Sequence, residues 1–283
     1  MRTYTEPCAD NPNLVDTCTI FDSFHEFTTK ANNSSFRDHF RRDFHGGKDY
    51  RTREQVKSAL SKGNLGLVGR SDKLMKHFEE LIIAPRPNYE VIPNVAGGFA
   101  MVPEMLAGSP VHMRMRRRTR SQLAPLSIVV DLASSGGIEA SLVEKRGTMA
   151  LALVRALSEI RPVNLYGLNI ADVYSSDKAN SGVLFPIETS PMDLAHAAHC
   201  LIHQSVPRGI MYELCSTLVG RHYFGMSWAW RDINKHRKLA PELCARALGE
   251  EVYYLPPMYL YDEGMNDPEA WFRARLTELS ENA

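Results

Sequence analysis

The chain has 283 residues, of which 44% are hydrophobic and 23% charged, and its formal net charge is zero. These values lie near the average of globular proteins and exclude a largely disordered chain and a fibrous repeat. Because no run of 18 apolar residues occurs and the first residues form no apolar segment, we expect a cytoplasmic protein that does not bind a membrane.

The first residues carry weak secondary-structure signals. Residues 1–20 are rich in Pro, Asn, Asp and Thr and have neither helical nor strand periodicity, which predicts an irregular arm. From Phe21 to Phe44, phenylalanines recur at intervals of three and four on either side of Asn32–Ser35. This spacing predicts two short amphipathic helices separated by a turn.

A helical region with a connector is predicted up to residue 110. Thr52 and Gln55 form a capping-box pattern, which predicts the start of a helix. A further helix is expected over Ser71–Ile83. The stretch Tyr89–Met113 carries three prolines and three glycines and is expected to be an ordered connector. We therefore expect residues 21–110 to form a helical N-terminal region and connector.

Strand and helix signals alternate after residue 125. Leu126–Leu132 is a run of aliphatic and β-branched residues, as expected for a strand buried on both faces of a parallel sheet. A helix over 139–160 and a strand over Val163–Leu168 complete a βαβ unit. We therefore expect an α/β fold, with a three-layer parallel-sheet domain of von Willebrand A-like or Rossmann-like type over 111–283. The further predicted elements are strands at 182–187 and 251–261 and helices at 191–204, 209–218, 232–248 and 268–279.

An arginine-rich segment, Val111–Arg120 (VHMRMRRRTR), precedes the first of these strands. No acidic residue lies between Glu104 and Asp131 to balance it. Guanidinium groups bind phosphates, and each neutralised phosphate releases counterions, so the segment predicts a nucleic-acid-binding site. The alternative is a solvated basic linker, either without a partner or paired with the acidic C-terminal residues. The arginines concerned are Arg114, Arg116, Arg117, Arg118 and Arg120.

A second basic stretch, residues 36–57, interleaves aromatic and basic side chains. Rings beside cations are typical of sites that hold unpaired bases, whereas Phe at helical spacing is more typical of a core. Tyr50 lies in a Gly-rich turn and is the ring that we expect to be exposed. We add the neighbouring Lys48, Arg51 and Arg53 to the predicted nucleic-acid-binding residues.

The sequence DLASSGG (Asp131–Gly137) follows the first predicted strand of the parallel sheet, at the end where open α/β sheets bind ligands. It resembles the metal-ion-dependent adhesion motif Asp-x-Ser-x-Ser of von Willebrand A domains, in which a carboxylate and two hydroxyls hold Mg²⁺. Ala133 replaces the middle ligand, so only Asp131 and Ser135 remain. We therefore expect a degenerate metal motif without a bound metal.

Three histidines, His196, His199 and His203, are spaced to share one face of a predicted helix. Two histidines four residues apart can bind one metal ion. The stretch contains no HExxH pattern, so a structural face is the favoured interpretation. The chain also has no GxSxG elbow and no GxxxxGK[ST] phosphate loop, and we predict a non-enzymatic protein without a cofactor.

Four blocks of the sequence resemble an uncharacterised family of tailed-phage proteins. They are the FxEF pattern at Phe24–Phe27, Gly46–Gly47, the block PNVAGGFAMVPEMLAGSPVHM, and the VVD strand followed by RGTMALALVRALSEI. In general size and character the chain is similar to the single-stranded-DNA-binding transcription factors of podoviruses that package a virion RNA polymerase. The resemblance implies single-stranded DNA and a phage RNA polymerase as partners, in the host cytoplasm.

Three hypotheses follow from the sequence. The favoured one is a nucleic-acid-binding protein that uses its arginines for phosphates and its aromatic rings for unpaired strands. The second is a von Willebrand A-like protein-interaction adaptor, for which Asp131 and Ser135 are the discriminating residues. The third is a metal-dependent enzyme built on His199, His203 and a distant carboxylate. The sequence leaves the oligomeric state open.

Overall fold

The computed structural model divides the chain into two compact units, residues 1–82 with 125–283 (the main unit) and residues 83–124 (the small unit). The sequence-based division at residues 20 and 110 does not coincide with these units, because both ends of the chain contribute to one sheet. The structure describes residues 1–8, 11–34, 46–70, 72, 76, 88–96, 98–119, 124–134, 138–158, 161–172, 178–189, 193–219, 233–257 and 266–281.

The main unit contains a six-stranded sheet with strand order β1-β2-β8-β7-β6-β9. Parallel pairing joins β6 to β7 and β9 and joins β2 to β8, whereas β1 with β2 and β7 with β8 are antiparallel. The predicted α/β class with a mostly parallel sheet is thus confirmed. The strands are β1 (Arg2–Cys8), β2 (Asn11–Ile20), β6 (Leu126–Asp131), β7 (Val163–Asp172), β8 (Lys178–Ile187) and β9 (Val252–Leu255).

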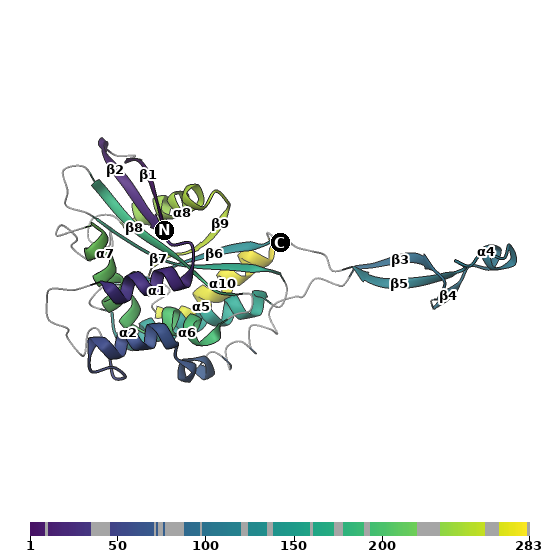
Figure 1. Cartoon of the computed structure of the whole chain (residues 1–283), viewed down its shortest axis with the longest axis horizontal. Helices are drawn as coiled ribbons and strands as arrows, with labels where there is room; N and C mark the ends of the chain where they lie inside the picture. Colours follow the sequence, from purple (N-terminus) through teal and green to yellow (C-terminus); the bar gives the residue numbers. More distant parts are fainter. Residues whose placement is uncertain are drawn as a thin grey trace. The chain divides into compact units, whose positions relative to one another are not determined.

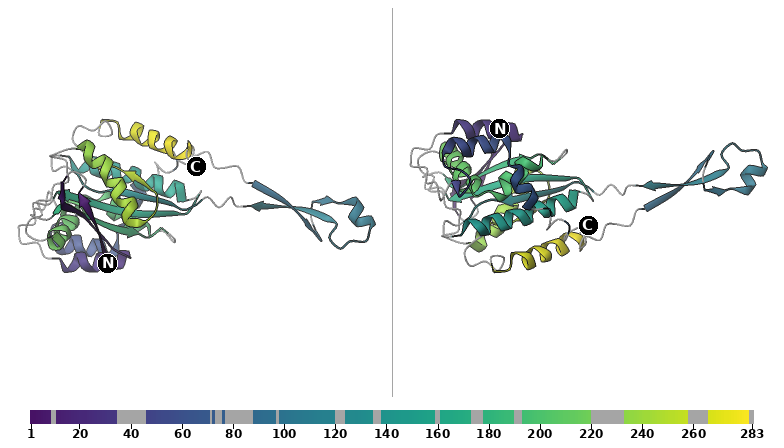
Figure 2. Two further views of the ribbon diagram at one scale, coloured as in Figure 1. Left: turned by 90° about the horizontal axis from the view of Figure 1, so that it is seen from above. Right: turned by 90° about the horizontal axis from the view of Figure 1, so that it is seen from below.

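Helices cover both faces of this sheet, as Figure 1 shows, and α8 lies in front of the strands in the left view of Figure 2. Val129 packs in one apolar cluster with α8, and the adjacent Ile128 and Val130 pack in the other with α1, α5 and α6. Alternate residues of β6 therefore serve two cores. The helices are α1 (Phe24–Asn33), α2 (Arg53–Lys62), α5 (Ala140–Ser158), α6 (Leu194–Ile202), α7 (Met211–Val219), α8 (Ile233–Leu248) and α10 (Pro268–Glu281), with a π-helical turn at Val206–Ile210.

Local sequence signals explain several of these helices. Thr52 caps α2 through a complete capping box with Gln55, as predicted. Phe24 and Phe27 of α1 are buried, and the Phe27 ring stacks on that of Phe185 with centroids 3.8 Å apart. The predicted helices over residues 36–44 and 71–83 lie outside the described residues or are described only at isolated positions.

Residues 1–20 form two strands, so the prediction of an irregular arm is wrong. β1 and β2 form an antiparallel pair, and β2 also pairs in parallel with β8 from Val15 to Ile20. The β2–β8 contacts join residues more than 160 positions apart, which no local pattern in the sequence reveals. The antiparallel orientation of β8 against β7 likewise differs from the simple βαβ alternation expected from the sequence.

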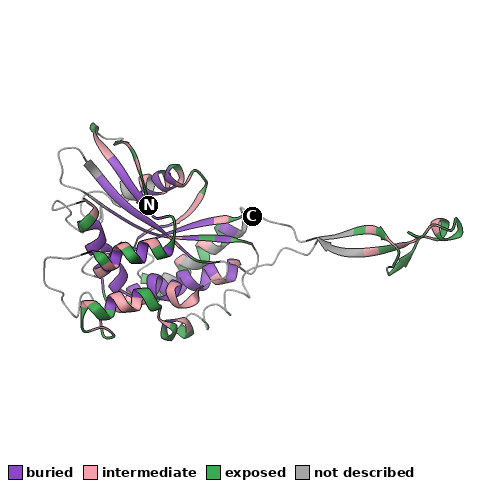
Figure 3. Ribbon diagram, in the orientation of Figure 1, coloured by how far each residue is buried: buried purple, intermediate pink, exposed green. Residues whose placement is uncertain are grey.

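The small unit contains a three-stranded antiparallel sheet, the small sheet, with order β3-β5-β4. Tyr89–Met113, expected as a connector, supplies most of it, because its backbone pairs with the arginine-rich strand. The elements are β3 (Asn88–Asn94), β4 (Phe99–Ala100), a short helix α4 (Val102–Leu106) and β5 (Met113–Thr119). None of the α4 residues is buried, as the colouring of Figure 3 shows.

Gly147→Ala is expected to lower the free energy of unfolding by about 1–3 kcal/mol, because a methyl group overpacks the contact between α5 and α6. A Cβ at residue 147 meets the Leu201 carbonyl oxygen at 1.9 Å. Urea denaturation followed by circular dichroism measures the change. Gly69→Ala is the matched control, since a Cβ there has no atom within 4 Å, and an equal loss in both variants contradicts the packing argument.

Candidate functional site

The arginine segment forms strand β5, the middle strand of the small sheet. Arg114 lies opposite Pro93 on β3 and opposite Phe99 on β4. Further along β5, backbone positions 116, 117 and 118 lie opposite Val91, Glu90 and Tyr89 of β3. Backbone hydrogen bonds thus hold this part of the segment extended, and Arg120 lies outside the described residues.

The two faces of the small sheet differ in exposure. Residues directly opposite one another in an antiparallel pair project from the same face, and neighbours along a strand project from opposite faces. Among the residues whose exposure the structure describes, one face carries exposed residues, and the other carries half-buried residues together with the exposed Ala100, so Arg114 and Phe99 share the more exposed face. The first face consists of Val91, Pro93, Phe99 and Arg114, and the second consists of Ile92, Asn94, Ala100, Met113 and Met115.

The small unit has a positive formal charge and also several exposed apolar side chains. Residues 83–124 contain six arginines and two glutamates, a formal charge of +4, and the rest of the chain contains 27 basic and 31 acidic residues, a formal charge of −4. The exposed large apolar side chains of this unit are Val91, Val95, Phe99, Val102, Met105, Leu106 and Val111. Cationic and apolar groups therefore occur together in one unit.

The second predicted basic group lies in the main unit and is only partly available. Lys48 and Arg51 are exposed. Arg53 Nε lies 2.6 Å from Oε1 of the buried Glu213, whose pKa is raised by burial and partly restored by the nearby cations. This ion pair fastens α2 to α7, which favours a structural role for Arg53.

Tyr50 is half-buried, so the prediction of an exposed ring is wrong. Its ring centroid lies 4.6 Å from that of His203 and 5.8 Å from that of His199, and its hydroxyl accepts a hydrogen bond from Asn64 Nδ2 at 3.0 Å. Burial also raises the pKa of the phenol. Packing by α6 and the turn after Gly47 explains why the Gly-rich setting did not leave the ring in solvent.

Asp131 ends β6 between the parallel neighbours β7 and β9, at the position where such sheets bind ligands. The residue is fully buried. Its Oδ1 accepts from the Ala133 backbone N–H at 2.9 Å, and its Oδ2 accepts from the Tyr254 hydroxyl at 2.8 Å. Arg146 donates to the Asp131 carbonyl oxygen at 3.0 Å and to the carbonyl oxygens of Leu255 and Pro256. Ser135 lies outside the described residues.

These hydrogen bonds join the ends of β6 and β9. The Asp131 carboxylate, the acidic ligand of the adhesion motif, accepts hydrogen bonds from the Ala133 backbone and from Tyr254. The Arg146 guanidinium donates to the Asp131 carbonyl oxygen. Asp131 therefore links the ends of β6 and β9 together with Tyr254 and Arg146, which the motif did not predict. Their contribution was missed because Tyr254 is 123 residues from Asp131 in the sequence.

Of the three histidines at α6, His199 and His203 are buried and His196 is half-buried. The His199 and His203 rings stack with centroids 5.5 Å apart. Nδ1 of His203 lies 2.7 Å from the Ser205 hydroxyl and its Nε2 lies 3.1 Å from Asp49 Oδ2. Both ring nitrogens of His199 are buried without a hydrogen-bond partner. Within the described part of the chain, no three His, Cys, Asp or Glu side chains are grouped to hold a metal ion.

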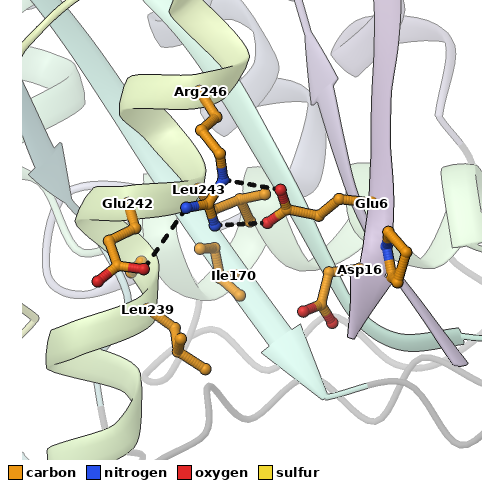
Figure 4. A pocket seen from close by; sticks show the side chains of 9 residues that line it. Glu6, Asp16, Ile170, Leu239, Glu242, Leu243 and Arg246 are labelled. Carbon is orange, nitrogen blue, oxygen red and sulfur yellow. Dashed lines mark hydrogen bonds and ion pairs between the residues drawn. The ribbon is translucent and has the colours of Figure 1, made fainter. Parts of the chain in front are cut away.

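A pocket of about 240 Å³ lies between α8 and the N-terminal strands, in a region where the sequence predicted no site (Figure 4). Arg246 forms a fork with Glu6, with two nitrogen–oxygen distances of 2.7 Å. Asp16 accepts from Asn180 Nδ2 at 2.5 Å, and burial raises the pKa of its carboxyl group. The Arg246–Glu6 pair thus joins α8 to β1 across the pocket, and Asp16 pairs with Asn180 of β8.

Comparison with known proteins identifies one family. A family model described as Domain of unknown function (DUF7192) matches residues 11–279. No curated protein and no solved structure matches the chain. Among the described helices, none combines the length and the hydropathy that crossing a membrane requires.

Tyr254→Phe is expected to lower the free energy of unfolding by about 1–3 kcal/mol, because buried Asp131 loses a hydrogen-bond donor. Tyr166→Phe serves as the control, since burial raises the pKa of Tyr166 and its hydroxyl donates no hydrogen bond to any residue that the structure describes. Thermal and urea unfolding measure both variants. Equal stability of the two variants contradicts a bracing role for the Asp131 contact.

Stability is expected to fall in acid because of His199. Burial lowers the pKa of His199 to about 3, well below the ordinary value of 6.5. The unfolded chain therefore binds a proton that the native state excludes, and stability declines as the pH falls from 6.5 towards 3. The expected loss between pH 7.5 and pH 5 is about 2 kcal/mol from this residue.

Urea denaturation at the two pH values tests this expectation with His199→Leu. The variant removes a polar group without a partner, so it should keep its stability at pH 7.5 and lose about 2 kcal/mol less than the wild type on acidification. His203 also has a lowered pKa and remains in both proteins as a shared background. An unchanged acid loss in the variant contradicts the assignment.

Proposed function

This chain is a member of the DUF7192 family, and we propose that it binds nucleic acid through the arginine-bearing strand β5. The observation that carries the proposal is the position of the arginine segment as the middle strand of a sheet. A strand advances about 3.4 Å per residue, so alternate positions such as 114 and 116 are about 6.8 Å apart. That spacing resembles the separation of successive phosphates along a nucleic-acid strand.

Charge supports the same proposal. The small unit carries +4 against −4 for the rest of the chain, and the exposed Arg114 offers its guanidinium to solvent. Such a charge distribution attracts polyanions to one unit and repels them from the other. The similarity to single-stranded-DNA-binding transcription factors adds single-stranded DNA and a phage RNA polymerase to the proposal as its ligand and its protein partner.

Replacing Arg116, Arg117 and Arg118 together by Gln is expected to weaken binding to single-stranded DNA at least tenfold at low salt. The slope of log affinity against log salt concentration should fall by about 1.4, because residues 116 and 118 lie at alternate positions from Arg114 and each phosphate contact on a single strand contributes about 0.7. Fluorescence anisotropy with labelled single-stranded DNA, duplex DNA and RNA at several salt concentrations measures both quantities.

The matched control replaces three exposed cations of the main unit, Arg2, Lys62 and Lys145, by Gln. This variant has the same net charge as the β5 variant and should retain the wild-type slope. Binding that is independent of salt in the wild-type protein, or equal losses in the two triple variants, rejects the proposed site.

We also propose that the main unit is a degenerate von Willebrand A-like domain. Support comes from the position of Asp131 at the end of β6, between β7 and β9, and from its occupation by hydrogen bonds with Ala133 and Tyr254. A protein-interaction adaptor is the corresponding second function. An adaptor of this kind would show a Mg²⁺-dependent interaction with its partner that is lost in Asp131→Ala. The Asp131 carboxylate already accepts internal hydrogen bonds, which favours the nucleic-acid proposal over the adaptor.

A further inference from the structure

We infer that Phe99 and Arg114 form a stacking site for an unpaired base on the exposed face of the small sheet. The base lies against the Phe99 ring, and the Arg114 guanidinium binds an adjoining phosphate. This inference rests on the proposed function and adds to it the residue that distinguishes single strands from duplexes.

The register of β4 and β5 brings these two residues together. Phe99 and Arg114 are directly opposite each other, so their Cβ atoms are about 5 Å apart and project from the same face. Pro93 lies opposite Arg114 on the other side and is also exposed. A backbone hydrogen bond of 2.7 Å from Met101 N to His112 O fixes the end of this pairing. The pair therefore has a defined position on the sheet.

Phe99 is more exposed than the other phenylalanines whose side chains the structure describes. Its exposed fraction is 54%, while Phe21, Phe24, Phe27 and Phe185 are all buried, with at most 7% exposed. An exposed phenyl ring costs hydration free energy, which stacking with a ligand ring recovers.

An unpaired base is the ligand that fits these groups. Bases within a duplex already stack on their neighbours and do not offer a face to a protein ring, whereas an unpaired base does. A guanidinium beside the ring supplies a phosphate contact and a cation that tolerates any base. The combination predicts affinity for single strands with little dependence on sequence.

Other exposed apolar residues of the small unit make protein docking the competing outcome. Leu106 is 80% exposed, more than Phe99, but has no ring. Docking of a protein on this surface depends on apolar area, so it is as sensitive to Leu106 as to Phe99. Base stacking depends on the aromatic ring alone, and this difference separates the two ligands.

The experiment compares Phe99→Ala, Phe99→Leu, Phe99→Trp and the control Leu106→Ala in full-length protein. The probe is a single-stranded oligonucleotide that carries the fluorescent base 2-aminopurine, with the matching duplex as a second ligand. We expect Phe99→Ala and Phe99→Leu to bind the single strand about tenfold more weakly with an unchanged salt slope. Phe99→Trp should retain affinity, and Leu106→Ala should match the wild type.

The outcomes separate this inference from the proposed function. Wild-type affinity of Phe99→Ala for the single strand, or equal losses in Phe99→Ala and Leu106→Ala, overturns the stacking site even where salt-dependent binding through β5 persists. If the wild-type protein binds no nucleic acid in a salt-dependent manner, the proposed function itself fails. Urea denaturation of each variant confirms an unchanged fold, as expected for exposed side chains, and Phe99→Trp tests the site without removing its ring.

Discussion

Parallel pairing of β6 with both β7 and β9 is the constraint on which the main unit depends. Because β6 is paired on both edges, its side chains serve both faces of the sheet, with Val129 in one core and Ile128 and Val130 in the other. A side-chain hydrogen bond also fixes the end of this strand, since the Tyr254 hydroxyl of β9 donates to the Asp131 carboxylate. Helices α5 and α8 then pack against opposite faces of a strand whose position is fixed.

At the carboxyl ends of β6 and β9, Asp131 and two backbone carbonyl groups bond within the protein. Arg146 donates to the carbonyl oxygens of Asp131 and Leu255, and Tyr254 donates to the Asp131 carboxylate. The buried His199 and His203 rings stack on each other, and Glu6 forms an ion pair with the exposed Arg246. The small unit differs, because its sheet presents charged and apolar side chains together on an exposed face.

Local signals in the sequence predicted the elements with strong periodicity or clear capping. The capping box at Thr52, the apolar strand β6 and the helix after it were all expected. The place of β2 in the sheet was missed, because its pairing with β8 depends on residues far away in the sequence, and β1 joins the sheet only through β2. The small sheet was missed because prolines and glycines dominate Tyr89–Met113, although the alternation Met-Arg-Met-Arg from Met113 is a strand signal. Phe99 went unnoticed for the same reason, since only the register shows that it lies opposite Arg114.

The central claim is that nucleic acid contacts the small sheet, and photo-crosslinking tests it most directly. Wild-type protein is irradiated with a single-stranded oligonucleotide that contains 5-bromouracil, and the modified peptides are identified by mass spectrometry. The account predicts adducts within β3, β4 and β5, residues 88–119, that disappear as salt is raised. Adducts confined to the main unit, or none at low salt, contradict it.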